Sequence, residues 1–199
     1  MEIKKLFGIE NKVAIVTGGS RGIGEMITAG FLANGVKVYI SARKAPALIE
    51  KAKELSDRYQ QECIPVPCDL STLEGIEDFV GVISEKEEGV DFLINNAGAA
   101  WGESFETFSE QGWDKVMDLN VKSMFFLTQK LKSHLLKRCT LDDPSRVINI
   151  GSIDGLNVPA LETFSYSASK ASVHHLTRVM AAKLVKENIL VNAIAPGPY

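Results

Sequence analysis

The sequence predicts an α/β fold in which one parallel sheet is wound outward in both directions from its centre, with helices on both faces. Apolar runs rich in β-branched residues, four to six residues long, alternate with longer segments of helical period. Asparagine-glycine and proline signals lie at several of the boundaries. This alternation favours parallel strands joined by right-handed crossovers, so we expect the doubly wound strand order 3-2-1-4-5-6.

The local sequence predicts each element in turn. Strands are expected in the apolar runs Val13–Thr17, Val36–Ser41, Ile64–Cys68, Phe92–Asn95, Arg146–Ile150 and Leu190–Ala195. Helices are expected at Gly22–Asn34, Pro46–Tyr59, Leu73–Glu87, Gly112–Lys137 and Tyr166–Lys186. Asn34-Gly35 signals the end of the first helix, and Pro46 fits a first helical turn, where its missing N–H loses no partner. No repeat or linker divides residues 1–199, so a single domain is predicted.

Composition excludes several classes of function. The 199 residues are 45% apolar, enough for a substantial core, and carry a net charge of −3. Such a chain has no overall positive field to attract nucleic acid or an anionic membrane. The start lacks the apolar run of a signal peptide, and no apolar stretch approaches the roughly 20 residues of a membrane span. We therefore expect a cytoplasmic protein that binds neither nucleic acid nor membrane.

Cysteine and histidine usage argues against disulfides and metals. The odd number of cysteines and the lack of a C-x-x-C pair are typical of reduced thiols; these are Cys63, Cys68 and Cys139. The histidines lie on helical patterns far from them in sequence, so no metal site is expected. They are interpreted as surface or packing residues: His134, His174 and His175.

A glycine-rich loop follows the first strand and leads into the first helix. It reads Thr17-Gly18-Gly19-Ser20-Arg21-Gly22-Ile23-Gly24. Glycines let the backbone turn sharply and approach a pyrophosphate, and the free N–H groups of a helix start bind anionic oxygens. The strand-turn-helix context favours a dinucleotide site over a tight turn without ligand. The expected contacts are Gly18, Ser20, Arg21, Gly22, Ile23 and Gly24.

The second strand predicts which dinucleotide binds. An NAD site places an acid about 20 residues beyond the glycines, against the ribose 2′-hydroxyl. Here no Asp or Glu lies between Glu25 and Glu50, whereas Arg43 follows the strand and Arg21 lies in the loop. Two guanidinium groups without an acid fit a 2′-phosphate, so NADPH/NADP+ is the expected cofactor. The alternative is that Arg43 points to solvent.

Tyr166 and Lys170 are the candidate proton-transfer pair. Four residues apart in a helix, their side chains project from one face. A free tyrosine holds its proton at neutral pH, and a nearby cation favours the phenolate. Such a pair suits an enzyme that moves a proton on or off a carbonyl oxygen. Taken alone, the spacing also occurs on ordinary solvated helices.

These motifs together resemble the short-chain dehydrogenase/reductase family in its single-domain branch, which has a Rossmann-type fold. The matches, in chain order, are Thr17-Gly18-x-x-x-Gly22-x-Gly24, Asn95-Asn96-Ala97-Gly98, Asn120, Ser152, Tyr166-x-x-x-Lys170 and Pro196-Gly197. Trp101-Gly102 and the spacing from Ser152 to Tyr166 are similar to the 3-oxoacyl (β-ketoacyl) reductases, including the branch linked to rhamnolipid synthesis.

The resemblance implies hydride transfer from NADPH to a ketone, with a 3-oxoacyl thioester on acyl carrier protein or coenzyme A as the favoured substrate. It implies that Tyr166 donates the proton, that Ser152 hydrogen-bonds the carbonyl oxygen, and that Lys170 binds the nicotinamide ribose. It implies that Asn120 holds a water that links Lys170 to solvent as a proton relay. It also implies further cofactor contacts at Asp69, Leu70, Asn96, Ala97, Gly98, Pro196 and Gly197. Taken singly, several of these residues also fit roles as turn, cap or solvated helix residues.

Apolar residues are expected to face the substrate. They lie after the Asn-Asn-Ala-Gly turn and between Ser152 and Tyr166: Trp101, Phe105, Phe108, Leu156, Val158, Leu161 and Phe164. Such a wall favours an acyl chain or another apolar ketone, and loop packing or a subunit contact is an equal alternative. A carrier-protein substrate needs a basic patch near the mouth. The candidates, which solvated helix surface explains equally well, are Lys130, Lys132, Lys137 and Arg138.

The chain departs from the family pattern at its end. Family members continue through a substrate-covering segment, a helix and a seventh strand, so we expect a truncated chain without that strand. Homodimer or homotetramer contacts are expected through the helices Gly112–Lys137 and Tyr166–Lys186. Three alternatives stay open: a reductase of another apolar alcohol or ketone, a sugar epimerase or dehydratase, and an inactive cofactor-binding fragment.

Overall fold

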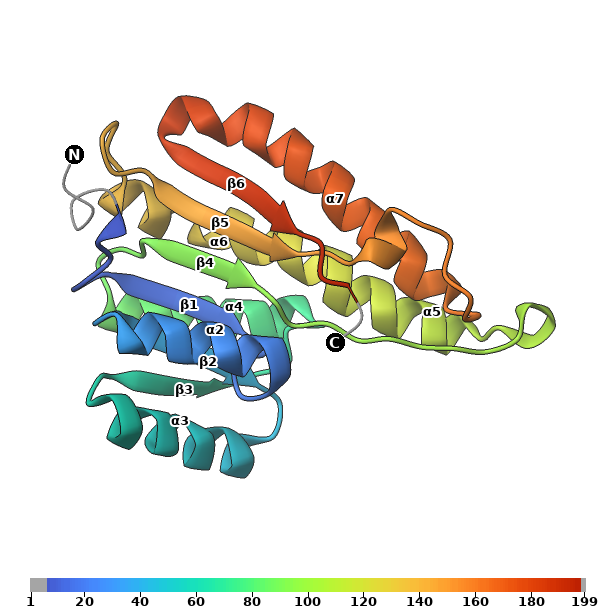
Figure 1. The fold of residues 1–199 in the computed structure, drawn as a ribbon, viewed down its shortest axis with the longest axis horizontal. Coiled ribbons are helices and arrows are strands. Elements are labelled where there is room, and N and C mark those ends of the chain that lie inside the picture. The colour runs from blue at the N-terminus through green and yellow to red at the C-terminus, as the bar shows by residue number, and fades with distance from the viewer. Residues whose placement is uncertain (1–6, 198–199) are drawn as a thin grey trace.

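The computed structural model describes residues 7–197, and these form one sheet of six parallel strands in the order β3-β2-β1-β4-β5-β6 (Figure 1). The strands are β1 (Val13–Thr17), β2 (Lys37–Ala42), β3 (Cys63–Pro67), β4 (Phe92–Asn95), β5 (Ser145–Ile150) and β6 (Ile189–Ile194). The chain winds outward to both edges from β1 and β4, which pair at the centre. The predicted fold class and strand order are confirmed.

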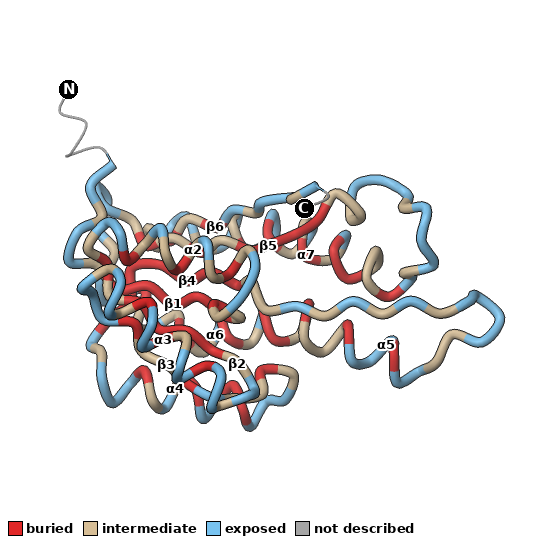
Figure 2. The backbone as a smooth tube through the Cα atoms, turned by 60° about the horizontal axis from the view of Figure 1, so that its bottom comes forward, coloured by how far each residue is buried: buried red, intermediate tan, exposed pale blue. Residues whose placement is uncertain are grey.

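Helices cover both faces of the sheet. They are α2 (Gly22–Ala33), α3 (Ala45–Tyr59), α4 (Leu73–Lys86), α5 (Glu110–Met117), α6 (Ser123–Arg138) and α7 (Phe164–Leu184). Alternate residues of β1 point to opposite faces. Ala14 and Val16 share a core with α2 and α3, whereas Val13 and Ile15 share one with α4, α6 and α7. Figure 2 shows the strands as the buried centre, with the outer faces of the helices exposed.

Local sequence signals lie at the beginning or the end of several elements, where the sequence predicted them. Pro46 lies in the first turn of α3. Asn34 ends α2, and Gly35 has a φ of +75°, which glycine adopts without strain. The last helix begins earlier than predicted, so Tyr166 lies in the first turn of α7. Short 3₁₀ helices complete the chain: η1 (Phe105–Thr107), η3 (Ile153–Gly155) and η4 (Val185–Glu187).

The predicted helix Gly112–Lys137 is helical throughout, but it is not one regular α-helix. A π-helical turn, η2 (Asp118–Lys122), separates α5 from α6. Asn120 lies in this turn and contacts the backbone of Ala99 twice. Its Nδ2 donates to the Ala99 carbonyl oxygen at 2.9 Å, and its Oδ1 accepts from the Ala99 N–H at 2.8 Å. Such single turns frequently lie at functional sites, and the apolar periodicity carries no signal for them.

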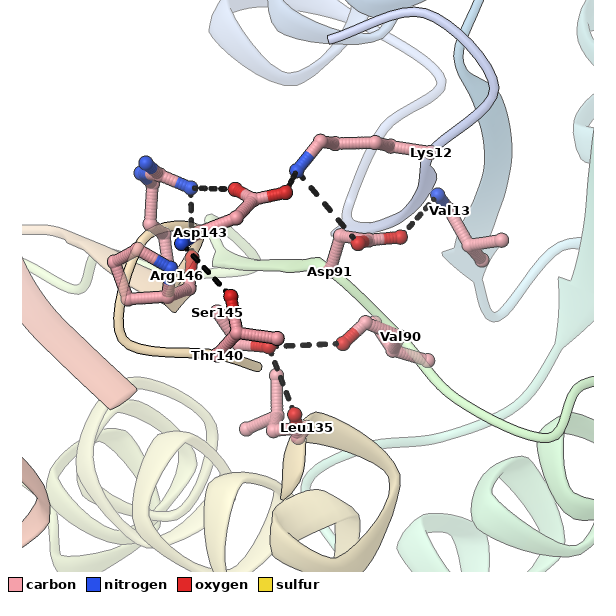
Figure 3. A network of polar contacts seen from close by, with 10 residues as sticks. Lys12, Val13, Val90, Asp91, Leu135, Thr140, Asp143, Ser145 and Arg146 are labelled. Carbon is pink, nitrogen blue, oxygen red and sulfur yellow. Dashed lines mark hydrogen bonds and ion pairs between the residues drawn. The ribbon is translucent and has the colours of Figure 1, made fainter. Parts of the chain in front are cut away.

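A polar network joins the amino ends of β1, β4 and β5 (Figure 3). Lys12 pairs with Asp143 and lies 3.9 Å from Asp91, and Asp91 Oδ2 accepts from the Val13 N–H at 2.8 Å. The hydrogen bond from Lys12, helped by Arg146 and opposed by burial, lowers the pKa of Asp143. The network therefore fixes the edge of the sheet that lies opposite the carboxyl ends of the strands.

None of the helices within residues 7–197 is long and apolar enough to cross a membrane. The same residues contain no group of three or more metal-ligating side chains. The three cysteines, all in the described part of the chain, are free. Burial raises the pKa of Cys63 and Cys68 to about 12, so both thiols stay protonated at neutral pH. Most of the N-terminal segment where no signal peptide was expected lies outside the described residues.

Candidate active site

The loops after β1 and β4 meet at the carboxyl edge of the sheet. Asn96 Nδ2 donates to the carbonyl oxygens of Thr17 at 2.9 Å and Gly18 at 3.2 Å. Thr17 Oγ1 accepts from the N–H groups of Asn96 and Ala97, each at 2.9 Å. In doubly wound sheets the ligand crevice lies where the strand order reverses, which here is between β1 and β4. The glycine loop and the Asn-Asn-Ala-Gly turn therefore border one crevice.

The glycine loop turns sharply and leads into a helix whose first N–H groups have no side-chain cap from the described part of the chain. Gly18 and Gly22 have φ values of +63° and +55°, which other residues rarely adopt. A Cβ on Gly24 would collide with the carbonyl oxygen of Gly18. Among the described residues no side chain caps α2 at Arg21, whereas Thr72 caps α4. The first N–H groups of α2 are therefore available to an anionic oxygen.

A cavity of about 610 Å³ lies beside this loop, at the carboxyl ends of β2 and β3. Its lining includes seven predicted cofactor contacts: Ser20, Arg21, Arg43, Asp69, Leu70, Ala97 and Gly98. Lys44 also lines it, a contact that the sequence-based prediction missed although it directly follows Arg43. Arg43 and Lys44 thus follow β2 where an NAD site has an acid, and Arg21 faces them from the glycine loop. Lys51 and the acids Glu50 and Glu54 of α3 also line the cavity.

Asp69 is held ionised at the rim of this cavity. Its Oδ1 accepts from the Ser71 N–H at 3.0 Å and the Ser71 hydroxyl at 2.7 Å. Burial acts to raise the pKa of Asp69, but these bonds and the charge of Arg43 outweigh it and lower the pKa. Leu70 beside it is buried. The turn after β3 is therefore fixed by Asp69 and presents an apolar surface next to it.

Tyr166 and Lys170 lie together on α7. Lys170 Nζ is 5.6 Å from the centroid of the Tyr166 ring. Lys170 is only 6% exposed, and its Nζ donates to the carbonyl oxygen of Ile150 at 2.7 Å. Burial lowers the pKa of Lys170 to about 8. Most Lys170 amines are therefore still charged at neutral pH, beside the phenol.

The buried amine predicts a pH-dependent stability. Lys170 has a pKa of about 8 folded and 10.5 as the unperturbed value, so between these values the unfolded chain binds more protons and stability rises with pH. We expect the free energy of unfolding of the wild type to rise relative to Lys170→Met by about 3 kcal/mol across this window. Urea unfolding at several pH values measures it. A difference that does not change with pH would contradict the lowered pKa.

Ser152 follows β5 directly and is buried. Its backbone is extended, with φ −164° and ψ 156°, and its Oγ accepts from the Asp154 N–H at 3.1 Å. Because that bond uses an oxygen lone pair, the hydroxyl proton remains free to donate. Ile153 N–H donates to the carbonyl oxygen of Pro196 at 3.0 Å, which places the predicted Pro196-Gly197 turn against the Ser152 segment.

Asn120 links the π turn to the Tyr166 segment. Its Nδ2 donates to Ser169 Oγ at 2.9 Å, and Ser169 Oγ donates to the carbonyl oxygen of Tyr166 at 2.7 Å. A Cβ on Gly98 would lie 3.2 Å from Asn120 Oδ1 and 3.8 Å from Lys170 Nζ, so these three residues are neighbours. Both amide hydrogens of Asn120 are used within the chain. A water at this residue can therefore bind only to its oxygen acceptors.

Two apolar hollows lie on either side of Phe164. One, of about 500 Å³, is lined by Phe105, Phe108 and Trp113 among others, and the second, of about 460 Å³, by Leu156, Val158 and Leu161 among others. Phe105 and Phe108 meet Phe164 edge to face, with centroids 5.6 and 5.7 Å away. All the predicted substrate-facing apolar residues except Trp101 therefore gather around Phe164.

Trp101 lies against α5 instead. Its ring fills the space left by the missing side chain of Gly112, and Lys115 Nζ lies 4.4 Å from the ring centroid. Within the described chain, Trp101 is not part of the lining of either hollow. Its contact with substrate stays a prediction.

The predicted basic patch near the mouth is wrong in its position. Lys137 and Arg138 lie against Gly89, which precedes β4. α6 runs antiparallel to the strands, so its end lies at the amino edge of the sheet, away from Ser152 and Asn96 (Figure 1). The other two lysines form ion pairs on the helix surface, Lys130 with Glu77 at 2.7 Å and Lys132 with Glu187 at 2.8 Å.

Known proteins share this arrangement along nearly the whole chain. A family model described as short chain dehydrogenase matches residues 12–199. The chain belongs to the short-chain dehydrogenase family. The rhamnolipids biosynthesis 3-oxoacyl-[acyl-carrier-protein] reductase of Pseudomonas aeruginosa is 42% identical over 193 residues, which are 97% of this chain and 75% of that protein. The 2-dehydro-3-deoxy-D-gluconate 5-dehydrogenase of Escherichia coli is 36% identical over 200 residues, with 98% and 74% covered.

Solved structures agree with this short-chain dehydrogenase assignment. The Pseudomonas aeruginosa RhlG/NADP active-site complex has a TM-score of 0.94 and 41% identity, covering 100% of this chain and 76% of that one. The L-sorbose reductase of Gluconobacter frateurii, complexed with NADPH and L-sorbose, has a TM-score of 0.90 and 30% identity, covering 96% and 70%. The family and the similarity to the rhamnolipid-type reductase, both predicted from the motifs, are confirmed.

Proposed function

We propose that this short-chain dehydrogenase binds NADPH and reduces a ketone, with a 3-oxoacyl thioester as its favoured substrate class. One observation carries the proposal. Tyr166, Lys170, Ser152 and Asn120, from three separate segments, converge at the carboxyl edge of the sheet, next to the glycine loop. A phenol, an amine and a hydroxyl gathered beside a dinucleotide crevice suit the reduction of a carbonyl group.

The residues of the crevice fit NADPH. Gly18 and Gly24 let the loop pack closely against itself and the Asn96 turn, and the uncapped start of α2 suits a pyrophosphate. Arg21, Arg43 and Lys44 line the neighbouring cavity and suit a ribose 2′-phosphate, because guanidinium and ammonium groups donate charge-assisted hydrogen bonds to phosphate oxygens. The RhlG structure, a complex with NADP, supports the same choice.

The chemistry then divides among four side chains. Bound NADPH supplies the hydride for the carbonyl carbon. Tyr166 gives its phenol proton to the carbonyl oxygen, so the ketone gains a hydride and a proton and becomes an alcohol. Ser152 donates its hydroxyl proton in a hydrogen bond to the same oxygen and stabilises the developing negative charge. Lys170 binds the ribose hydroxyls and its charge stabilises the phenolate, and a water on an oxygen of Asn120 returns a proton from solvent.

The hollows around Phe164 favour an acyl chain as part of the substrate. Phe105, Val158 and Leu161 are 72%, 97% and 74% exposed, and exposed apolar side chains gathered beside a site are typical of a binding surface. The Pseudomonas aeruginosa relative is named a 3-oxoacyl-[acyl-carrier-protein] reductase. A keto sugar is the second candidate, because the gluconate dehydrogenase and the sorbose reductase are also relatives. The aromatic lining favours the first.

Loss of NADPH absorbance on addition of a ketone tests the proposal. We expect turnover with acetoacetyl-CoA and none with L-sorbose. Turnover with L-sorbose and not with acetoacetyl-CoA would mean that the substrate is a keto sugar. Binding of NADPH without turnover of either ketone would contradict the reductase and favour a cofactor-binding protein.

Arg43→Ala is expected to weaken NADPH binding by about 10- to 100-fold, because a hydrogen bond to a charged group contributes about 1.5–3 kcal/mol. NADH lacks the 2′-phosphate, so its affinity should change little. Titration of cofactor fluorescence measures both dissociation constants. Arg58→Ala is the matched control, because Arg58 stacks on Tyr59 and does not line the cavity of the described chain. Equal weakening of NADPH and NADH would contradict the phosphate contact.

We also propose a homodimer or homotetramer formed through α5, α6 and α7. These helices expose large apolar side chains, each at least 37% exposed: Trp113, Phe125, Leu136 and Val179. Exposed apolar surface of this kind is typical of protein interfaces. Sedimentation velocity measures the assembly, and a monomer at working concentration would contradict it.

A further inference from the structure

We infer that His174 is a positioning residue that holds Ser152 in place, an inference that rests on the proposed function. His174 Nε2 lies 3.0 Å from the carbonyl oxygen of Ser152. A carbonyl oxygen only accepts hydrogen bonds, so in this contact Nε2 carries the proton and the imidazole donates. The sequence-based interpretation of His174 as a surface or packing residue gave no sign of this contact.

His174 and Lys170 both bond the backbone at the end of β5. Lys170 Nζ bonds the carbonyl oxygen of Ile150 at 2.7 Å, and His174 Nε2 bonds that of Ser152. A Cβ on Gly155 would meet the backbone of Lys170, so the segment after β5 runs antiparallel to α7, and the Lys170 side chain reaches back along it to Ile150. α7 therefore holds this backbone at two points, one of them at Ser152.

Glycine makes this approach possible. A Cβ on Gly151 would lie 2.3 Å from Cε1 and 2.7 Å from Nε2 of His174, which is closer than real side chains pack. A Cβ on Gly155 would lie 2.7 Å from the N atom of Ala171 in the backbone of α7. The segment that carries Ser152 is therefore in direct contact with α7 at both of its glycines, and the imidazole ring lies between that segment and the helix.

The contact fixes the direction of the Ser152 hydroxyl. The Ser152 carbonyl also accepts from the Gly155 N–H at 3.1 Å, and Ser152 Oγ accepts from the Asp154 N–H at 3.1 Å. With the carbonyl and the hydroxyl oxygen both held, the hydroxyl proton is left to donate to a substrate. Loss of the imidazole removes one of these constraints. A shift of about 1 Å in a reacting group lowers a rate by as much as 10²-fold.

Five variants, with Ser152→Ala as the background of one, test the inference by their kcat, their KM for acetoacetyl-CoA and their Kd for NADPH. His174→Leu is expected to lower kcat by about 10- to 100-fold, with little change in the Kd for NADPH. His174→Gln, whose amide can donate to the same carbonyl, should restore most of kcat. His175→Leu, at the exposed neighbouring position, should match the wild type. In a Ser152→Ala background, His174→Leu should lower kcat no further, because the Ser152 hydroxyl that His174 positions is absent.

Wild-type kcat in His174→Leu, or a full additional loss in the Ser152→Ala background, would overturn the inference. If the wild type reduces no ketone, the proposed function fails. Amide hydrogen exchange then tests, without any activity, whether His174 holds the Ser152 segment in place. The amides of Asp154 and Gly155 are expected to exchange faster in His174→Leu than in the wild type and in His174→Gln. Equal exchange would overturn the inference. If His174→Leu does not fold, His174→Met gives the same comparison.

Discussion

Tyr166→Phe is expected to lower kcat by about 10³-fold or more, because general acid catalysis contributes about 10²- to 10⁴-fold and the variant loses the only proposed proton donor. The substitution keeps the ring that lies 5.6 Å from Lys170 Nζ and removes only the hydroxyl. Ser152, Lys170 and the glycine loop stay in place, so the Kd for NADPH should stay close to that of the wild type.

NADPH oxidation with acetoacetyl-CoA gives the rate of this variant, and cofactor fluorescence gives its affinity. Tyr59→Phe, on α3 and outside the crevice lining of the described chain, is the matched control and should keep the wild-type rate. A wild-type kcat in Tyr166→Phe would assign the proton to another donor. A loss of NADPH affinity as large as the loss of turnover would give Tyr166 a binding role in place of a chemical one.

Ser152→Ala is expected to lower kcat by about 10²- to 10³-fold, as removal of one hydrogen-bond donor to a developing oxyanion does elsewhere. The hydroxyl is held by the Asp154 N–H at 3.1 Å and is free to donate its proton. The hydrogen bond from the Ser152 hydroxyl to the substrate strengthens as charge builds on the carbonyl oxygen. Its loss should therefore lower kcat more than it raises KM.

Steady-state kinetics with acetoacetyl-CoA measure this split. Ser152→Thr keeps the hydroxyl and should retain far more activity than the alanine variant. Ser172→Ala is a matched control, since Ser172 Oγ bonds the Ala168 carbonyl oxygen within α7 at 2.9 Å. An equal loss in Ser152→Ala and Ser152→Thr would mean that the site needs the size of serine and not its proton.

The fold could be predicted because its signals are local and repeated. All five residues of β1 are buried, as a central parallel strand requires, and the run Val13–Thr17 has this apolar character in the sequence. Gly18 and Gly22 have positive φ, in keeping with the sharp turn that the glycine loop predicted. The spacing of Tyr166 and Lys170 needed only the pitch of a helix, so the pair was predictable before any tertiary contact was known.

The rest of the site depends on contacts between distant segments. Asn120 reaches Ala99 only because of a π turn, which the apolar periodicity on either side does not record. His174 contacts Ser152 across 22 residues of chain. The contact requires a glycine at position 151, and the sequence does not show this requirement because it arises only when α7 packs against that residue. The basic residues at the end of α6 were placed at the wrong edge, since a charge cluster says nothing of the direction in which its helix runs.

The central claim is that Tyr166 and Lys170 act beside bound NADPH to reduce a ketone, and isotope transfer tests it most directly. NADPH dideuterated at nicotinamide carbon 4 is incubated with acetoacetyl-CoA, and the product is analysed by mass spectrometry. We predict 3-hydroxybutyryl-CoA that carries deuterium on carbon 3, formed by Tyr166→Phe about 10³-fold or more slowly than by the wild type. Unlabelled product, or labelled product formed at the same rate by both proteins, would contradict the claim.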